Sequence, residues 1–173
     1  MIILITGPSH VGKTNLAQKL MEKYHYPYLS IDHLKMCLIR SGNTDLTPLS
    51  SDEALTVFLW PIVREMIKTA IENGQNLIVE GCYIPFDWKK DFAADYLVHI
   101  RYLCLVFSKD YIEKNFLKIQ TCANVIERRM DDSGLNKAEL MEENEKNLIQ
   151  CRLYDCPHIL IHDRYDLDAI KEM

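Results

Sequence analysis

The sequence predicts an α/β domain in which a parallel five-stranded β-sheet carries helices on both faces. Two observations lead to this fold class. Five short apolar stretches with the composition of buried strands alternate along the chain with longer stretches of helical periodicity. The first apolar stretch also runs straight into a glycine-containing loop that opens a helix. Because the 173 residues contain no repeat, low-complexity tract or linker, we expect one domain over residues 1–173.

The first two strand–helix units occupy the first forty residues. Ile2 to Ile5 is a continuous isoleucine-rich run, typical of a strand that is buried on both faces. A helix is predicted over Lys13 to Lys23. A second strand over Tyr26 to Asp32 is then followed by a helix around His33 to Arg40, and residues 41–48 have the composition of a loop.

A long amphipathic helix and a third strand follow. The pattern Ser50-x-x-Glu53 predicts a capping box at the start of this helix, and Gly74 is expected to end it. Pro61 lies inside the helix and predicts a kink, because proline removes one hydrogen bond and clashes with the preceding turn. The third strand is predicted over Asn76 to Glu80.

The rest of the chain predicts two more strands and a long polar helical region. Ser108 and Asn136 are expected to cap helices of that region. The predicted elements, in order, are a partly helical stretch at 83–97, a strand over Tyr102 to Phe107, helices over Lys109 to Tyr154 with a break at 131–134, a strand over His158 to Ile161 and a short C-terminal helix.

The composition excludes several classes of protein. The formal net charge is −5, and the longest basic runs are pairs, which argues against a nucleic-acid partner. No apolar stretch approaches the ~20 residues that a membrane-spanning helix needs, and the N-terminus lacks the features of a signal peptide. The six cysteines have no metal-binding spacing and are interpreted as reduced thiols. We therefore expect a cytoplasmic protein, either monomer or homodimer.

The strongest functional motif is Gly7-x-x-x-x-Gly12-Lys13-Thr14, between the first strand and the first helix. Glycines let the backbone turn so that its N–H groups surround a phosphate, and the helix N-terminus adds partial positive charge. The Lys13 ammonium is predicted to reach the β and γ phosphates, and the Thr14 hydroxyl to ligate Mg²⁺. The residues predicted to bind the nucleotide are Gly7, Pro8, Ser9, His10, Val11, Gly12, Lys13, Thr14 and Asn15.

Two acids lie where the second and third strands end. Ligands of open α/β sheets gather at the carboxyl ends of the strands, so Asp32 and Glu80 are candidate site residues. Asp32 is predicted to orient an acceptor hydroxyl and take its proton, and Glu80 to hold Mg²⁺ with Thr14. The alternative for Asp32 is a purely structural helix N-cap.

Basic residues elsewhere are weaker candidates. Arg128 and Arg129 lie after the fourth strand, where a lid could bring positive charge to the transferring phosphate, although a solvated helix also carries arginines. Lys35 and Arg40 follow Asp32 and could bind an anionic group of the acceptor.

An acceptor pocket is predicted beside Glu80. Gly81 and Tyr83 follow that acid directly and are candidate acceptor-binding residues. Phe86 and Trp88 could also line the pocket, but aromatic residues at such positions are more often part of the core.

The strings I-I-L-I-T-G-P-S-H-V-G-K-T, L-S-I-D-H-L-K and L-I-V-E-G resemble those of adenylate-kinase-like small-molecule kinases of the P-loop superfamily. The nearest groups are 2-phosphoglycerate kinase-like proteins and zeta-toxin or chloramphenicol-phosphotransferase-like proteins. This resemblance implies a three-layer fold with strand order 2-3-1-4-5, and a lid over approximately residues 109–150. It also implies ATP and Mg²⁺, with Asp32 near the acceptor. His10 and Lys35 stand where adenylate kinases usually have glycine and arginine, which leaves the acceptor open.

The predicted function is therefore that of an ATP- and Mg²⁺-dependent phosphotransferase acting on a small-molecule acceptor. One alternative is a nucleoside monophosphate kinase, in which Lys35 and Arg40 would grip the acceptor phosphate. Another is a regulatory P-loop NTPase without a small-molecule acceptor. A GTPase is disfavoured, because residues 136–139 (N-K-A-E) only approach the N-K-x-D pattern and do not follow an apolar strand.

Overall fold

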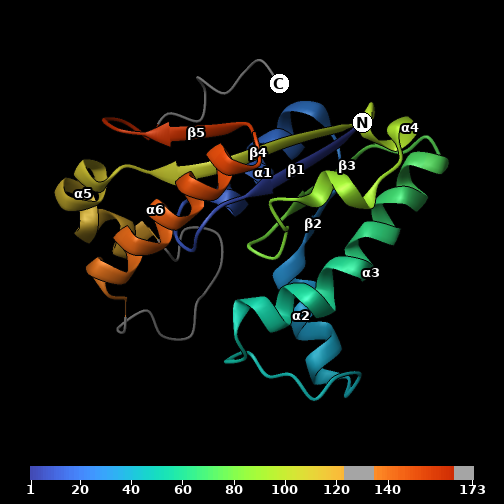
Figure 1. Ribbon diagram of the computed structural model, residues 1–173, viewed down its shortest axis with the longest axis horizontal. Helices are drawn as coiled ribbons and strands as arrows, with labels where there is room; N and C mark the ends of the chain where they lie inside the picture. The colour runs from blue at the N-terminus through green and yellow to red at the C-terminus, as the bar shows by residue number, and fades with distance from the viewer. Residues whose placement is uncertain (123–134, 166–173) are drawn as a thin grey trace.

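A computed structural model of the chain describes residues 1–122 and 135–165. Its centre is an all-parallel sheet of five strands in the order β2-β3-β1-β4-β5 (Figure 1). This confirms the predicted α/β class, the parallel sheet and the strand order that the resemblance implied. The strands are β1 (Ile2–Thr6), β2 (Tyr28–Ser30), β3 (Leu77–Glu80), β4 (Ile100–Phe107) and β5 (His158–Ile161).

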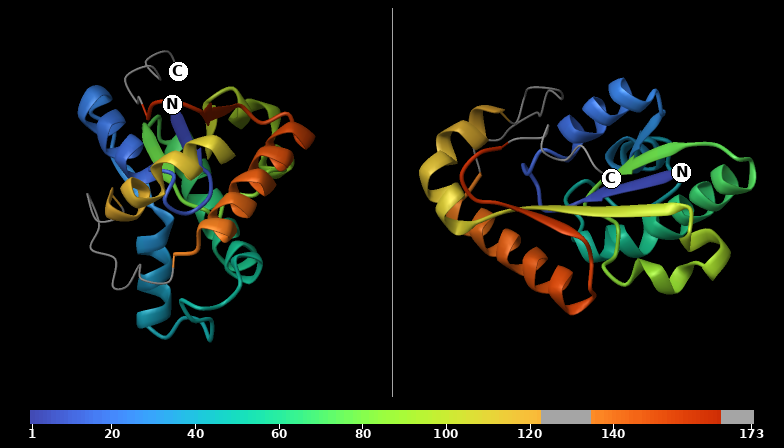
Figure 2. Two further views of the ribbon diagram at one scale, coloured as in Figure 1. Left: turned by 90° about the vertical axis from the view of Figure 1, so that its left-hand side faces the viewer. Right: turned by 90° about the horizontal axis from the view of Figure 1, so that it is seen from above.

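Helices cover the sheet on both faces, as predicted (Figure 2). The helix α1 packs on one face, whereas α3 and the turn η1 pack on the other. The described helices are α1 (Lys13–Tyr24), α2 (Ile31–Arg40), α3 (Asp52–Glu72), η1 (Trp88–Asp91), α4 (Ala94–Leu97), α5 (Lys109–Cys122) and α6 (Lys137–Leu153).

The sheet has an apolar core on each face, and the alternation of side chains along β4 explains why β4 contributes to both. Tyr102, Cys104 and Val106 pack with α3, and the intervening Leu103 and Leu105 pack with α1. Successive strand residues point to opposite faces, so a strand buried on both faces has to be apolar throughout. This requirement accounts for the nearly continuous apolar run that identified β4 in the sequence.

The register of the strands brings the predicted site residues to one edge. Glu80, the last residue of β3, pairs with Ile5 near the end of β1 and with Ser30 at the end of β2. The phosphate loop follows β1 and the helix α2 follows β2. The carboxyl ends of these three neighbouring strands therefore place the loop, Glu80 and the start of α2 together.

Two predicted boundaries are wrong by a few residues. The second strand ends at Ser30, and α2 begins at Ile31, so Asp32 lies in the first turn of a helix. The long helix is capped by Ser51, whose Oγ accepts from the Ala54 N–H, and Ser50 Oγ accepts from Thr47 N–H instead. Both errors arise because two nearby residues suit the same capping position, Ser30 and Asp32 at α2 and Ser50 and Ser51 at α3.

Other predicted helix ends are confirmed. Gly74 follows α3 with a positive φ, and its N–H bonds to the Ile71 carbonyl. Ser108 Oγ accepts from the Tyr111 N–H, and Asn136 Oδ1 accepts from the Ala138 N–H. The helix α3 continues through Pro61 as a single element.

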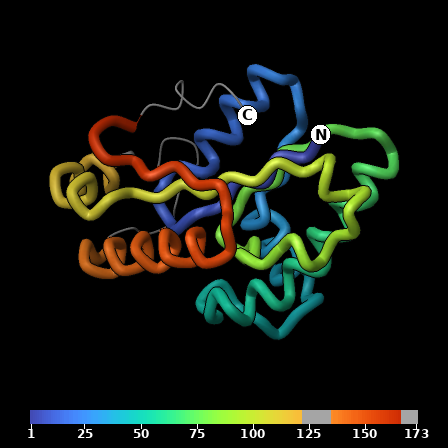
Figure 3. The backbone as a smooth tube through the Cα atoms, turned by 45° about the horizontal axis from the view of Figure 1, so that its top comes forward, coloured from blue at the N-terminus to red at the C-terminus, as the bar shows by residue number. Residues whose placement is uncertain are grey.

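The region after β4 packs partly against the sheet. The helix α6 runs alongside β4 (Figure 3), and Cys151 of α6 belongs to the core on that side. The predicted break at 131–134 and the C-terminal helix lie outside the described residues. Within the described ranges, none of the helices has the length and apolar character that crossing a membrane requires.

Candidate functional site

The loop between β1 and α1 is built around two glycines with positive φ. Gly7 has a φ of 137°, and a Cβ there would lie 2.3 Å from the Leu105 carbonyl oxygen. Gly12 has a φ of 86°, and a Cβ there would lie 2.0 Å from the Tyr165 hydroxyl. Any side chain at either position would clash, so the loop needs glycine for both its conformation and its packing.

The start of α1 is arranged as an anion site. Its N-cap is Gly12, which offers no side-chain acceptor, and the Leu16 N–H bonds to the Gly12 carbonyl. The first N–H groups of the helix are therefore left to a ligand, and the helix dipole favours negative charge there. His10 adopts a φ of 66°, a strained value for a non-glycine residue that shows how tightly the loop turns.

Lys13 lies under this loop. Its Nζ donates to the Pro8 carbonyl at 2.8 Å, and the residue is 7% exposed. Burial lowers the pKa of the ammonium, but Cys82 and Glu80, together with Asp32, outweigh burial and leave the pKa raised. Lys13 therefore stays charged at neutral pH, ready to exchange its carbonyl partner for a phosphate.

Thr14 and Glu80 form the second part of the site. The Thr14 hydroxyl lies 3.4 Å from Glu80 Oε2, and Glu80 is 1% exposed at the end of β3. A hydroxyl and a carboxylate are the oxygen donors that Mg²⁺ prefers, and Mg²⁺ usually completes its shell with water and substrate phosphates. In the part of the chain that the structure describes, no three His, Cys, Asp or Glu side chains gather as a metal cage. This donor pair thus fits a metal that is shared with a phosphate ligand.

The predicted acceptor residues form a connected group at the start of α2. Lys35 Nζ donates to Asp32 Oδ1 at 2.5 Å and to the Tyr83 hydroxyl at 2.9 Å. Burial lowers the pKa of Lys35, but its hydrogen bonds to Asp32 and Tyr83 leave that pKa raised. Ser30, and not Asp32, is the N-cap of α2, so the alternative that Asp32 serves only as a helix N-cap is wrong.

The other candidates are placed differently. Arg40 is exposed in the last turn of α2, ~12 Å along the helix axis from Asp32, so the structure does not bring it to this group. Trp88 is 3% exposed and stacks on Tyr102 in the core, which removes it from the acceptor pocket. Arg128 and Arg129 lie outside the described residues.

Two residues of the site escaped sequence analysis. Tyr165 follows β5 and donates its hydroxyl to the Gly12 carbonyl at 3.0 Å, while its ring meets Phe107 edge-on. Burial raises the pKa of Tyr165, and a hydrogen bond with Asn15 opposes this effect. Cys82 interacts with Lys13 and lies two residues beyond Glu80. The signal that could have identified these two residues in the sequence is their position after the fifth and third strands.

Comparison with known protein sequences gives a partial match. No protein-family model matches the chain. Over 101 residues, it is 28% identical to a cytidylate kinase from Borreliella burgdorferi (strain ZS7). This alignment covers 56% of the chain and 46% of that cytidylate kinase, so the chain matches less than half of its length.

Solved structures resemble the whole chain. A sugar kinase from Janibacter sp. HTCC2649 has a TM-score of 0.55 at 15% identity, covering 99% of this chain and 90% of its own. A shikimate kinase from Bacteroides thetaiotaomicron has a TM-score of 0.53 at 16% identity, covering 98% and 93%. A gluconokinase from Sinorhizobium meliloti 1021 has a TM-score of 0.50 at 14% identity, covering 97% and 85%. The chain therefore shares the overall fold of these three kinases.

Proposed function

We propose that this chain, which has the fold of P-loop small-molecule kinases, is an ATP- and Mg²⁺-dependent phosphotransferase acting on a hydroxyl of a small molecule. One observation carries the proposal: the Thr14 hydroxyl, beside Lys13, lies 3.4 Å from Glu80 Oε2, and Glu80 pairs in register with Ser30, which precedes α2 and Asp32. The phosphate loop, the candidate metal pair and the candidate acceptor acid therefore share one site. Such a grouping is what transfer of a phosphoryl group between two bound molecules requires.

Each part has a role in binding ATP. The N–H groups of the loop and of the first turn of α1 hold the phosphates, and Lys13 exchanges the Pro8 carbonyl for the β and γ phosphate oxygens. Thr14 and Glu80 would hold Mg²⁺, which supplies positive charge to the phosphate oxygens when it is bound.

Asp32 acts on the acceptor. A hydroxyl placed against its carboxylate loses its proton to Asp32 while its oxygen bonds to the γ-phosphorus. The bond between that phosphorus and the β–γ bridging oxygen breaks, and ADP leaves with the electron pair. Arg128 and Arg129 are proposed to bring positive charge to the transferring group from the lid, approximately residues 109–150.

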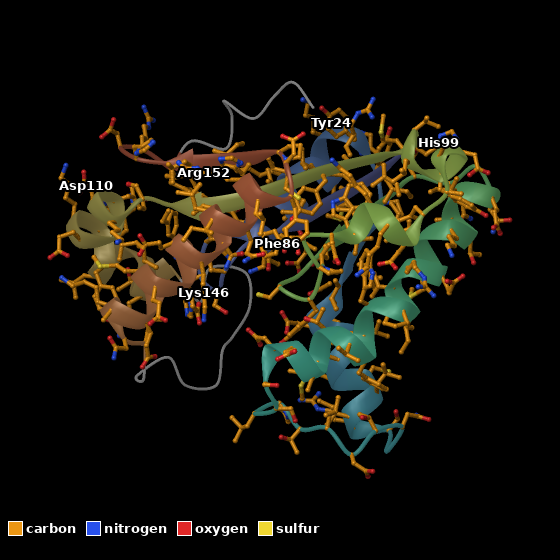
Figure 4. All side chains as sticks on the ribbon, viewed as in Figure 1. Tyr24, Phe86, His99, Asp110, Lys146 and Arg152 are labelled. Atoms are coloured by element: carbon orange, nitrogen blue, oxygen red, sulfur yellow. The ribbon has the colours of Figure 1, made fainter. Side chains whose placement is uncertain are left out.

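The test is Asp32→Asn, with Asp110→Asn as its matched control. Asp110 is likewise an acid in the first turn of a helix, but it lies on α5 (Figure 4). We expect Asp32→Asn to keep ATP affinity and to lower phosphoryl transfer ~100-fold, and Asp110→Asn to change neither. If Asp32→Asn mainly lowers the unfolding free energy and leaves transfer intact, Asp32 acts only on the helix dipole.

A nucleoside monophosphate kinase is the second candidate, favoured by the partial match to a cytidylate kinase. Under this alternative, CMP or another monophosphate accepts the phosphate, and Lys35 binds the acceptor phosphate. Measuring ADP formation from Mg-ATP with nucleosides, monophosphates, phosphoglycerates and sugars separates the two candidates. Tight ATP binding without stimulation by any of these acceptors would favour a regulatory NTPase.

A further inference from the structure

The side chain of Lys35 is enclosed on the side of α2 that faces the protein. It is 12% exposed, and its ammonium lies 5.0 Å from the centre of the Tyr83 ring as well as within hydrogen-bond distance of the Tyr83 hydroxyl. Tyr83 itself is 5% exposed. The buried Tyr83 therefore contacts the Lys35 ammonium on the side that faces the protein.

Asp32 has the opposite exposure. Its side chain is 38% exposed, although it shares the 2.5 Å ion pair with Lys35. An approaching acceptor thus meets the carboxylate of Asp32 and not the ammonium of Lys35. Asp32 and Tyr83 take two of the three N–H donors of the Lys35 ammonium. An anion that displaced Asp32 from Lys35 would also leave that carboxylate without its cation.

The neighbouring helices add more negative charge. Partial burial and then the charge of Asp52, at the start of α3, raise the pKa of Glu143 on α6, while Lys13 and Lys146 lower it. Lys146 is exposed on α6 (Figure 4). Glu143, which also acts on Lys13, therefore adds negative charge near the phosphate loop.

We propose that Lys35, held by Tyr83, is a positioning residue for Asp32, and that the acceptor is an uncharged hydroxyl compound and not a phosphorylated one. This inference rests on the proposed phosphotransferase function. Lys35 fixes one carboxylate oxygen of Asp32 and leaves the other free for the hydroxyl proton. Tyr83 acts on Asp32 indirectly, because it fixes the position of Lys35.

The first experiment compares acceptor classes with the full chain and Mg-ATP. The uncharged probes are glucose, glycerol, adenosine and cytidine, and the anionic probes are AMP, CMP and 3-phosphoglycerate. We expect at least one uncharged probe to raise ADP formation about tenfold or more above the rate with water, and the anionic probes to have no such effect. Stimulation by anionic probes alone would overturn the inference while leaving the phosphotransferase function intact.

The second experiment separates positioning from acceptor binding. With the stimulating acceptor, Lys35→Met is expected to lower kcat about 100-fold and to change the acceptor KM less than about threefold, because the lysine does not touch the acceptor. Lys35→Arg restores part of kcat, and Tyr83→Phe lowers it about fivefold. A rise in acceptor KM of about tenfold with unchanged kcat in Lys35→Met would show that Lys35 binds the acceptor.

A matched control and an acceptor-independent measurement complete the design. Lys90→Met removes an ion pair of the same spacing, between the exposed Lys90 of η1 and Asp87 just before η1. This substitution should leave kcat unchanged. NMR of lysine ammonium groups should show slow proton exchange for Lys35 that Asp32→Asn and Tyr83→Phe accelerate. If no acceptor gives ADP, the proposed function fails, and rapid exchange at Lys35 in the unmodified protein would separately refute the positioning role.

Discussion

Gly81→Ala tests whether packing behind the site sets the position of Asp32. A Cβ at Gly81 would lie 2.8 Å from Ile31 Cβ and 3.1 Å from its Cγ1 and Cδ1. Ordinary contacts begin at 3.4 Å, so the end of β3 and the start of α2 have to separate by about 0.6 Å. Ile31 precedes Asp32 in the chain, and the carboxylate has to move with it.

The expected effects follow from this displacement. Forcing a methyl group into a packed site costs about 1–3 kcal/mol of unfolding free energy. A shift of up to about 1 Å in a reacting group lowers transfer by roughly 10- to 100-fold. Urea unfolding followed by circular dichroism measures the stability, and ADP formation with the identified acceptor measures kcat.

The control is Gly42→Ala. Gly42 has a φ of 73°, and nothing lies within 4 Å of a Cβ placed there. This substitution costs about 1 kcal/mol of backbone strain and should leave kcat unchanged. If Gly81→Ala keeps both the stability and the kcat of the unmodified protein, the contact with Ile31 does not position Asp32 and the reasoning is wrong.

Three further predictions concern binding, the metal and the core. Lys13→Met should abolish measurable ATP binding by calorimetry, and unchanged affinity would contradict the phosphate-loop assignment. Glu80→Gln should raise the Mg²⁺ concentration needed for half-maximal activity about tenfold, and an unaltered Mg²⁺ titration would count against its metal role. Asn144 is 1% exposed, and its side-chain oxygen accepts from the Phe107 N–H at 2.7 Å. Asn144→Leu should leave that donor unpaired and lower the unfolding free energy measured in urea by about 1–3 kcal/mol. A smaller loss of unfolding free energy would mean that the Phe107 N–H finds another acceptor.

A fifth prediction is a pH dependence. The pKa of Lys35 is raised above its ordinary value of 10.5, since its partners favour the charged form more than burial disfavours it. Its stabilising effect is therefore complete below that ordinary value and is lost as the pH rises through the raised pKa. The stability difference between the unmodified protein and Lys35→Met should stay constant from neutral pH to about 10 and then shrink; a difference that shrinks already near neutral pH would contradict this sign.

The sequence predicted the sheet and the phosphate loop because each depends on local patterns. The apolar runs of β1 and β4 identify strands buried on both faces, and the spacing of Gly7, Gly12 and Lys13 specifies a phosphate-binding turn. These features need little information from distant parts of the chain.

The acceptor side was less predictable because it depends on distant contacts. Nothing in the sequence pairs Lys35 with Tyr83, which lies 48 residues away, or shows that this contact encloses the ammonium. Arg40 looked equivalent to Lys35 in the sequence, yet it lies in the last turn of α2, more than one helical turn beyond Lys35. The start of α2 was also misplaced, since Ser30 and Asp32 are both good N-cap residues and only the backbone distinguishes them.

The contact between Tyr165 and Gly12 has a consequence for how the protein is made. It joins residues 153 positions apart, and Gly12 can take no side chain because the tyrosine fills that space. During synthesis, the phosphate loop emerges early but lacks this support until almost the whole described chain has been translated. Such non-local contacts form late in folding. We therefore expect full affinity for ATP to appear only after β5 has joined the sheet, which makes nucleotide binding a reporter of complete folding.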